Sequence, residues 1–542
     1  MGLRLLCVCI LLAIRTGLAD AARTSAVALP DGLPYQIGTL TNTLHIWVDP
    51  VSGVDAGRTG TVASQPLKTL KAAWSKARLH PSTRILIIPL LLVVPWMGAE
   101  VPCCAAVPEW LEYKSGTYKT PIIIEAAAGE IVNVNTFVAV RFCKYLYFVG
   151  IRINFLGNAD GNHPFHCEGC TGLLMRRVRV RGSPTKTREA VKVNQCKGVY
   201  IEQCDFAVST DNALDAVAWQ YGHVIDSKLH DCGFGVYFKG GSAYIIAARN
   251  RIFRTGQLGI AAGFDTGFEW MVSPWLRYEA YDIKIINNLI YDINQAAGVS
   301  VYGGYNILVA HNTLYRVGAS GAPFSIRQGL RSCDDDYPER CSQYHRAGGW
   351  GQPGGMPQWA QISIPNRNVF LVNNLVVNPA GYTTANQFNI PEVVPYCHEY
   401  SSGPCKPSLG GLSGSIAADA GLVIRGNYIW NAATYLGIDP DPGWETGCRN
   451  TNPSCTAALV LARNDINNAT QKPVLVSPGD GNFRLKPGSL SGFAKLWAIP
   501  KWGAWAGGLN SAAGNSTNSV LTDFTGARRT AHNNAPGAYL QS

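Results

Sequence analysis

The sequence predicts an all-β fold, a parallel β-helix in which short strands stack turn upon turn, because one short pattern recurs along the chain. The pattern is a β-branched apolar run, a polar step ending in Asn, a second apolar alternation and a turn, in residues 243–256, 281–294 and 305–318. One such unit cannot bury its own apolar face, so successive units must stack. Leucine-rich repeats share the period, but the chain lacks their Leu-x-x-Leu-x-Leu motif, which leaves the β-helix.

The Asn of this pattern gives the predicted register of the stack. Equivalent positions recur with the period of roughly 20 to 30 residues that is typical of solenoids, at Gly150, Arg177, Gln203, Ser227, Asn250, Asn288, Asn312, Asn374 and Asn427. Seven residues before the first seven of these positions lie Cys143, Cys170, Cys196, Gln220, Ala243, Tyr281 and Tyr305. The three cysteines are therefore predicted to form a vertical stack, about 4.8 Å apart, a separation that a disulfide can span.

The first 22 residues have the order of a secretory signal peptide, with Arg4, an apolar run from Leu5 to Ile14 and small residues near Ala21. Secretion is the expectation, since the run is too short to span a membrane. Removal of this segment leaves an even number of cysteines, which suits an oxidising compartment. Loop disulfides and glycosylation sites are predicted at Cys333 with Cys341, Cys397 with Cys405, Cys448 with Cys455, and at Asn468 and Asn515.

A short helix beginning near Pro66 and Thr69 is expected to cap the open end of the solenoid. The segments Trp47-Val-Asp-Pro50, Gly53-x-Asp55 and Pro66-Leu-Lys-Thr-Leu70, followed by the strand-Asn units, resemble secreted right-handed parallel β-helix proteins of the pectin-lyase-like superfamily. Residues 481–489 and 523–538 resemble the closing segments of those chains. The resemblance implies a right-handed solenoid with a short N-terminal capping helix. It does not select among lyases, hydrolases, epimerases and noncatalytic binders.

The predicted β-helix domain covers residues 41–538, with loop insertions near 319–366 and 381–420, where the period fails. Long insertions in solenoids often form the walls of a binding site. Residues 85–112 depart from the family pattern, with Pro89 and Pro95 inside an apolar run. They are either a buried insertion or an error in the gene model.

Candidate catalytic residues are Lys239, Asp215 and Glu279, which lie 11, 12 and 9 residues before their Asn-equivalent positions. They should therefore project from similar places on neighbouring turns. Eliminative cleavage of an acidic polysaccharide needs a base and a cation or metal that stabilises the developing enolate. Lysine serves as a base when its pKa is lowered, so the sequence favours a lyase with Lys239 as the base. Turn aspartates also commonly bond only to backbone, which keeps a structural role open.

Ligands for the polysaccharide are predicted to include Arg277, Trp275 and Trp350. Metal ligands are predicted at Asp215, Asp231 and Asp265, because carboxylates suit Ca²⁺. The formal net charge of +10 is scattered, and it favours an anionic partner without identifying one. A zinc site at Cys167-x-x-Cys170 lacks a second ligand pair. A monomer is expected, with no nucleic-acid or membrane partner.

Two other functions stay open. Glu279 with Asp215 or Asp265 would supply the carboxylate pair of a glycoside hydrolase, and a noncatalytic cell-wall or adhesion protein would use the solenoid only for binding. The sequence lacks Gly-x-Ser-x-Gly, His-Glu-x-x-His, phosphate-loop and dinucleotide motifs, so those enzyme classes are not first choices.

Overall fold

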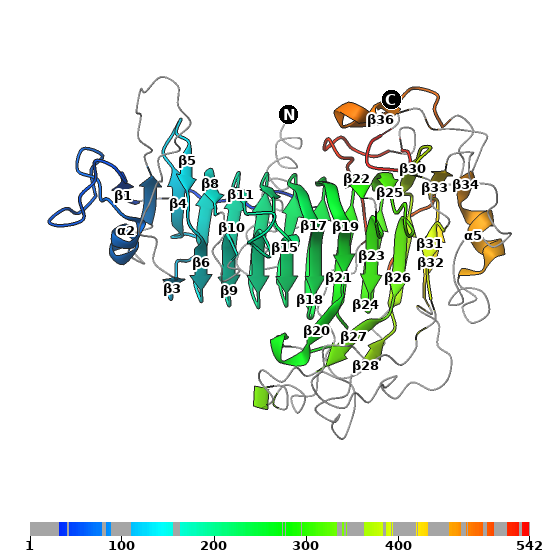
Figure 1. Cartoon of the computed structure of the whole chain (residues 1–542), viewed down its shortest axis with the longest axis horizontal. Helices are drawn as coiled ribbons and strands as arrows, with labels where there is room; N and C mark the ends of the chain where they lie inside the picture. The colour runs from blue at the N-terminus through cyan, green and yellow to red at the C-terminus, as the bar shows by residue number, and fades with distance from the viewer. Residues whose placement is uncertain are drawn as a thin grey trace, which may run out of the picture.

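The computed structural model describes most of the solenoid and the segments that pack on it (Figure 1). The described residues are 32–40, 43–77, 83–87, 110–155, 163–273, 275–276, 278–293, 295–332, 339–340, 343, 362–382, 386–391, 393, 419, 421–431, 455–467, 473, 475–490, 496–502, 518–530 and 534–540. The signal peptide, both glycosylation sequons, most of the 85–112 segment and Cys333, Cys341, Cys397, Cys405 and Cys448 lie outside them. Among the described residues, no helix has the length and apolar character needed to cross a membrane.

Three parallel stacks of strands form the walls of the solenoid. We call the first sheet 1; its strands are, in spatial order, β1 (Leu44–Val48), β2 (Thr83–Ile87), β4 (Ile122–Ala126), β7 (Leu146–Val149), β10 (Thr171–Arg176), β13 (Lys197–Glu202), β16 (Gln220–Ile225), β18 (Ser242–Ala248), β21 (Ala280–Ile286), β24 (Gly304–Ala310), β29 (Arg367–Val372) and β32 (Val423–Arg425).

The other two stacks are joined where the long strands β17 (Lys228–Lys239) and β19 (Arg251–Ala262) run through both. Sheet 2 contains β5 (Val132–Val134), β8 (Ile151–Asn154), β11 (Arg179–Arg181), β14 (Asp205–Ala207), the first parts of β17 and β19, β22 (Leu289–Ile293), β25 (Thr313–Val317), β30 (Leu375–Asn378), β33 (Tyr428–Asn431) and β34 (Asp465–Asn467). Sheet 3 contains β3 (Leu111–Glu112), β6 (Val138–Arg141), β9 (Phe165–Glu168), β12 (Val191–Asn194), β15 (Asn212–Val217), the second parts of β17 and β19, β23 (Val299–Tyr302), β26 (Phe324–Arg327) and β31 (Phe388–Asn389).

Smaller elements complete the molecule. Helix α2 (Leu70–Lys76) starts at Thr69, whose side chain accepts a hydrogen bond from the Ala72 amide, and it buries Leu70, Ala73 and Trp74 against the first coil. This confirms the predicted capping helix. The remaining described elements are β20 (Asp265–Gly267), β27 (Gly329–Ser332), β28 (Ile362–Ile364), β35 (Leu475–Ser477), β36 (Asn482–Leu485), the helix α5 (Ala457–Arg463) and the 3-10 helices η2 (Phe268–Trp270) and η4 (Pro478–Asp480).

The core is a column of aliphatic side chains enclosed by the three sheets. Alternation along each strand produces it: in β12, Val191 and Val193 are buried while Lys192 and Asn194 face outward. Since period-two side chains in stacked strands lie above one another, each outward position forms a column of side chains along the solenoid. Those outward columns are where a functional site can be built.

A ladder of buried asparagines runs along the turn between sheets 1 and 2. In Asn288, the side-chain amide donates to the Asn312 carbonyl oxygen at 3.0 Å, and its own oxygen accepts from the Asn250 amide nitrogen at 3.0 Å. The ladder continues through Asn374, Asn427 and Asn464. It confirms the predicted register from Ser227 onward, where Ser227 donates its backbone amide to Asn250.

The predicted register is wrong by one residue before that point. The Cys204 amide donates to the Ser227 hydroxyl, so Cys204 and not Gln203 is the equivalent of Ser227. Gly150, Arg177 and Gln203 have positive φ and belong to the turn position one residue earlier. The cysteine column is therefore continued by Trp219, which aligns with Cys196, rather than by Gln220.

The predicted stack of Cys143, Cys170 and Cys196 exists without disulfides. The three thiols are free and buried, as are those of Cys167, Cys204 and Cys232. Burial raises the pKa of Cys143 to about 12, so these groups act as small apolar core residues. Cys455 is disulfide-bonded, and among the described residues no group of three metal-ligating side chains exists that would make Cys167 and Cys170 a zinc site.

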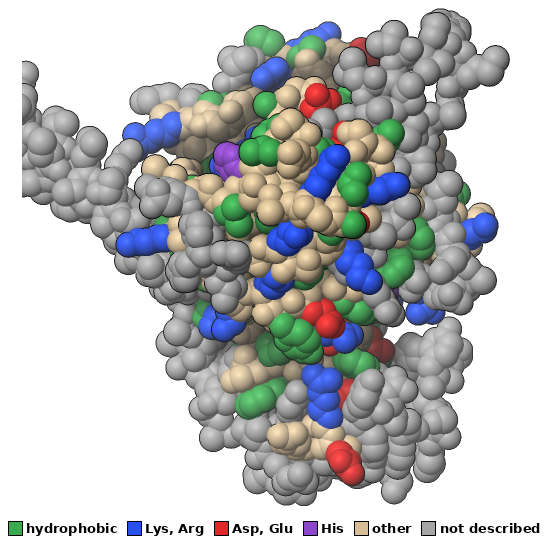
Figure 2. All heavy atoms as spheres, turned by 90° about the vertical axis from the view of Figure 1, so that its left-hand side faces the viewer, with side chains coloured by type: hydrophobic (Ala, Val, Ile, Leu, Met, Phe, Trp, Pro, Cys, Tyr) green, Lys and Arg blue, Asp and Glu red, His purple; other side chains and the backbone are tan. Residues whose placement is uncertain are grey.

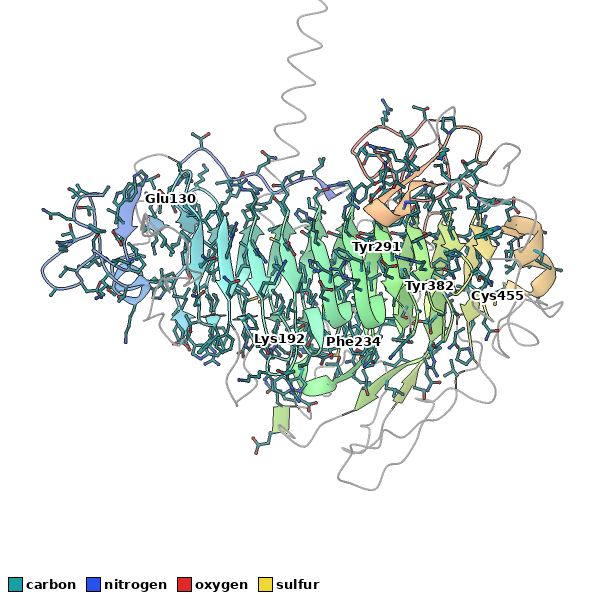
Figure 3. All side chains as sticks on the ribbon, turned by 45° about the horizontal axis from the view of Figure 1, so that its top comes forward. Glu130, Lys192, Phe234, Tyr291, Tyr382 and Cys455 are labelled. Atoms are coloured by element: carbon teal, nitrogen blue, oxygen red, sulfur yellow. The ribbon has the colours of Figure 1, made fainter. Side chains whose placement is uncertain are left out.

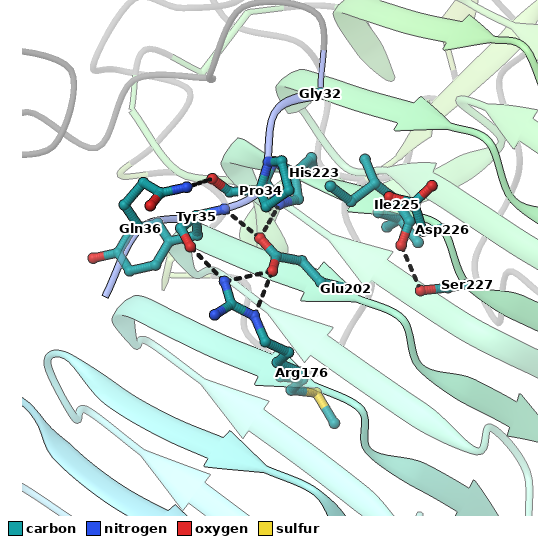
Figure 4. A network of polar contacts seen from close by, with 12 residues as sticks. Gly32, Pro34, Tyr35, Gln36, Arg176, Glu202, His223, Ile225, Asp226 and Ser227 are labelled. Carbon is teal, nitrogen blue, oxygen red and sulfur yellow. Dashed lines mark hydrogen bonds and ion pairs between the residues drawn. The ribbon is translucent and has the colours of Figure 1, made fainter. Parts of the chain in front are cut away.

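The N-terminal segment 32–40 crosses the outer face of sheet 1 (Figure 4). It is held by the buried Glu202, which accepts from the Tyr35 amide at 2.5 Å, from His223 Nε2 at 2.8 Å and from Arg176 Nε at 2.7 Å. Tyr35 stacks on Tyr200 with 4.3 Å between the ring centroids. A cavity of about 310 Å³ lies beside this segment, on sheet 1 and not on sheet 3.

A buried carboxyl on sheet 1 gives a testable pH dependence. Burial raises the pKa of Asp282 to about 7 from an ordinary value of 3.8, although Asn306 donates to the carboxyl at 3.1 Å. The folded protein therefore holds a proton that the unfolded chain releases, and this contribution to stability is complete below about pH 4 and lost as the pH rises through about 7. Asp282→Asn should be more stable than the native chain at pH 8, by up to roughly 4 kcal/mol, and equal to it near pH 4. Urea unfolding at the two pH values checks this, and equal differences at both would contradict it.

Candidate functional site

A cluster of charged side chains lies on the outer face of sheet 3, on strands β12, β15 and β17. The strand register pairs Lys192 with Asp215 and Asp215 with Tyr237, so these three side chains form one outward column. Figure 3 labels Lys192 and Phe234 along the lower edge of the solenoid and Tyr291 nearer its upper edge. The site is thus made by neighbouring strands of the scaffold, which fix its geometry.

Lys192 is the fixed cation of the cluster. Its Nζ lies 2.7 Å from Asp215 Oδ2 and 3.2 Å from Glu189 Oε1. Burial alone would lower the pKa of Lys192, but the charges of Asp215 and Glu189 outweigh burial and raise the pKa above its ordinary value. Lys192 therefore stays protonated, and it neutralises the carboxylates on both sides.

Lys239 is the second cation, at the end of β17. Its Nζ lies 3.8 Å from Asp215 Oδ1, which is too long for a hydrogen bond. The register places Lys239 opposite Val217, two residues beyond Asp215, so both side chains leave the same face. The sequence thus correctly predicted that Lys239 and Asp215 lie together.

Two more carboxyls border the cluster with opposite pKa shifts. Burial, with the nearby charges of Glu189 and Asp215, raises the pKa of Asp211. Burial opposes ionisation of Glu189 as well, but His163, whose Nδ1 lies 2.6 Å from Oε2, and Lys192 together lower its pKa. The cluster therefore contains one carboxyl with a raised pKa beside one with a lowered pKa.

Aromatic rings adjoin Lys239. The rings of Tyr237 and Phe264 stack at 4.8 Å and 14°, and Tyr302 meets Phe264 edge-on at 5.6 Å. The Lys239 ammonium lies 5.6 Å from the Tyr237 ring and 5.9 Å from the Phe264 ring. Phe264 is 38% exposed, so a ligand can reach its ring. The Tyr237 hydroxyl is buried and has no hydrogen-bond partner among the described residues, and burial raises its pKa, which keeps it protonated.

Glu279 is separate from this cluster. It is fully buried, its Oε1 lies 2.6 Å from Arg331 Nη1, and its Oε2 accepts from the Gly240 amide at 3.1 Å. Burial raises the pKa of Glu279, and the Arg331 charge opposes that effect. The carboxylate therefore braces the turn that follows Lys239 and does not face solvent.

The aspartates expected to bind calcium do not share a site. Asp231 pairs with Arg254 at 2.7 Å and with His230 at 2.5 Å, whereas Asp215 is held by the two lysines. Asp265 lies on β20, in a separate small sheet with β27 and β28. No three metal-ligating side chains converge within the described ranges, so the residues present do not fit a calcium ion.

Of the expected substrate ligands, only Trp275 is described. It is half-buried and packs in the apolar cluster around Tyr244 and Phe268. Arg277 and Trp350 lie outside the described residues.

Sequence inspection missed Lys192, Glu189, Asp211, Tyr237 and Phe264. One signal becomes visible with the corrected register: Lys192 precedes Cys204 by the same interval, 12 residues, by which Asp215 precedes Ser227. The others carry no motif, because their roles come from contacts between coils.

The comparisons with known proteins agree with this architecture. The model of the family described as right handed beta helix region matches residues 165–325, and no curated protein matches. Similar solved structures include XylC in complex with xylose (9% identity, TM-score 0.47, covering 91% of this chain and 98% of that one) and pectate lyase Pel9A (12%, 0.37, 68% and 82%). The A-module of the mannuronan C-5 epimerase AlgE6 of Azotobacter vinelandii is another (10%, 0.38, 74% and 93%). The chain folds as a right-handed parallel β-helix, as the sequence predicted.

Proposed function

We propose that the protein is a secreted enzyme that cleaves an acidic polysaccharide by β-elimination at the Lys239–Asp215 cluster. The observation that carries the proposal is the 3.8 Å separation of Lys239 Nζ from the Asp215 carboxylate, on a face that also offers an exposed aromatic ring. A uronate needs a cation for its carboxylate, an apolar surface for its ring and a base for its proton. The cluster supplies all three.

In this mechanism Lys239 first releases its ammonium proton to water, and the neutral amine then removes the proton on the carbon next to the uronate carboxylate. The C–H electrons form the ring double bond, and the bond to the leaving glycosidic oxygen breaks. Lys192, held as a cation, stabilises the negative charge that develops on the carboxylate. A water molecule donates the proton to the departing oxygen.

The test is the growth of ultraviolet absorbance from unsaturated products when the native protein is mixed with pectate, alginate or glucuronan, each with and without added calcium. We expect absorbance to grow on at least one polymer. Reducing ends released without absorbance would instead establish hydrolysis, and silence in both assays would favour a noncatalytic binding protein.

Hydrolysis is the second candidate, favoured by the paired carboxyls and not by Glu279. Asp211, with its raised pKa, would act as the acid, and Asp215 would act as the ionised partner. The Asp211→Asn variant distinguishes the two functions. It should abolish hydrolysis, whereas the rate of elimination should stay within a few-fold of the native rate.

A further inference from the structure

We infer that the protein carries a second glycan-binding station, the exposed aromatic pair Tyr113 and Phe142, which holds a distant part of the same polysaccharide chain. The inference rests on the proposed function for the identity of the occupant. It adds a substrate requirement, a chain long enough to reach from this pair to Lys239.

The pair forms a flat apolar surface in solvent. Tyr113 is 67% exposed and Phe142 is 45% exposed, and their rings stack with centroids 5.5 Å apart and planes within 21°. Exposure of two apolar rings to water is unfavourable in free energy. Saccharide rings have apolar faces that can stack on aromatic side chains and cover them.

The two rings occupy a turn position that repeats along the solenoid. Its φ is positive on successive coils: 56° at Tyr113, 51° at Phe142, 61° at Gly169, 52° at Gln195 and 55° at Ala218. Glycine occupies the same position on the next coil, at Gly169, where an added Cβ would come within 2.5 Å of the Phe142 ring. The ring therefore lies over Gly169, on the side toward the Lys239 cluster.

The station lies in the turn directly after a column of sheet 3 that reaches Lys239. Successive register pairs join Arg141 to Glu168, Asn194, Val217 and Lys239. Four strand spacings separate the ends, about 19 Å. Arg141, next to Phe142, lies 4.1 Å from the Trp110 ring, and Lys239 lies over Tyr237 and Phe264. The column thus has a cation with aromatic rings at each end.

Charge is consistent with an acidic occupant but does not provide most of the binding. Glu112 and Glu168 lie 3.6 and 3.4 Å from Arg141 and compensate it. Lys144 and Lys197 are exposed on the same edge of the solenoid. They lie two coils apart in one column, with Thr171 on the coil between them. Figure 2, which faces this end of the solenoid, shows Lys and Arg side chains spread over the surface and few acidic ones. We therefore assign binding at the station to ring stacking, with the lysines providing long-range attraction.

The experiment compares the native chain with Phe142→Gly and Tyr113→Gly, alone and together. Glycine removes the ring and suits the positive φ, so the fold should survive. Dissociation constants are measured for polygalacturonate, alginate and glucuronan, each as polymer and as its disaccharide. We expect the double variant to bind at least one polymer about tenfold more weakly and the disaccharides unchanged. Trp497→Ala, which removes an exposed ring from the C-terminal segment, is the control and should bind as native.

Equal weakening for polymer and disaccharide, or no weakening for any polymer, would overturn the station, as would a native chain that binds no polymer. Its failure and that of the proposed function are distinguishable. Polymer binding that depends on the two rings, without formation of any product, would support the station and contradict the proposed lyase activity. Product formation that requires Lys239, together with polymer binding that is unchanged in the double variant, would support the lyase activity and contradict the station.

Discussion

Lys239→Arg is expected to lose at least about a hundredfold in kcat, the usual contribution of a general base, while KM stays within a few-fold of native. Arginine keeps the positive charge beside Asp215 but does not release its proton in proteins, so the substitution separates the base from the cation. Lys239→Ala should lose the same activity and also raise KM. The measurement is initial rate against polymer concentration, followed by ultraviolet absorbance.

Lys228→Ala is the matched control, because Lys228 is an exposed lysine at the other end of the same strand. It should keep native kinetics. A Lys239→Arg variant with native kcat would show that Lys239 binds the carboxylate and that another group removes the proton.

Arg331→Met is expected to destabilise the protein by about 3–5 kcal/mol, the cost of leaving one partner of a buried ion pair alone. Arg331 is 1% exposed and Glu279 is fully buried. The guanidinium also donates to the Thr266 carbonyl oxygen at 2.9 Å. Urea unfolding at pH 7 measures the loss.

Glu279→Gln in the Arg331→Met background should recover much of it, because glutamine removes the buried charge and still accepts from the Gly240 amide. No recovery would mean that packing of the arginine side chain, and not its charge, provides the stability. Since Glu279 holds the turn after Lys239, the Arg331→Met variant alone should also have a lower kcat.

Local pattern was enough to predict the solenoid, the stacking register of the asparagines from Ser227 onward and the proximity of Lys239 to Asp215. These follow from a repeat whose period is visible in the chain, and from side chains that alternate with period two. The register error before Ser227 has a physical origin. There the ladder position is occupied by Cys204, while the polar Gln203 at the preceding positive-φ position imitates the pattern.

The role of Glu279 could not be found in the same way. Its partner Arg331 comes from the insertion after residue 318. No feature of the local sequence predicts that this arginine forms an ion pair with a buried carboxylate. The shifted pKa of Asp211 has a similar source, since Glu189 and Asp215 come from neighbouring coils. Contacts between coils set these properties, and only the three-dimensional arrangement reveals them.

The asparagine ladder also bears on how such a chain can change over evolutionary time. Its consecutive amide contacts stay between 2.8 and 3.0 Å while the partners are 24, 37, 38, 53 or 62 residues apart in the chain. A longer excursion costs little, about 0.6 kcal/mol for each doubling of its length. Mutation can therefore lengthen or replace the loops that border the charged cluster while the amides keep the coils in place, so new specificities can arise without a new scaffold.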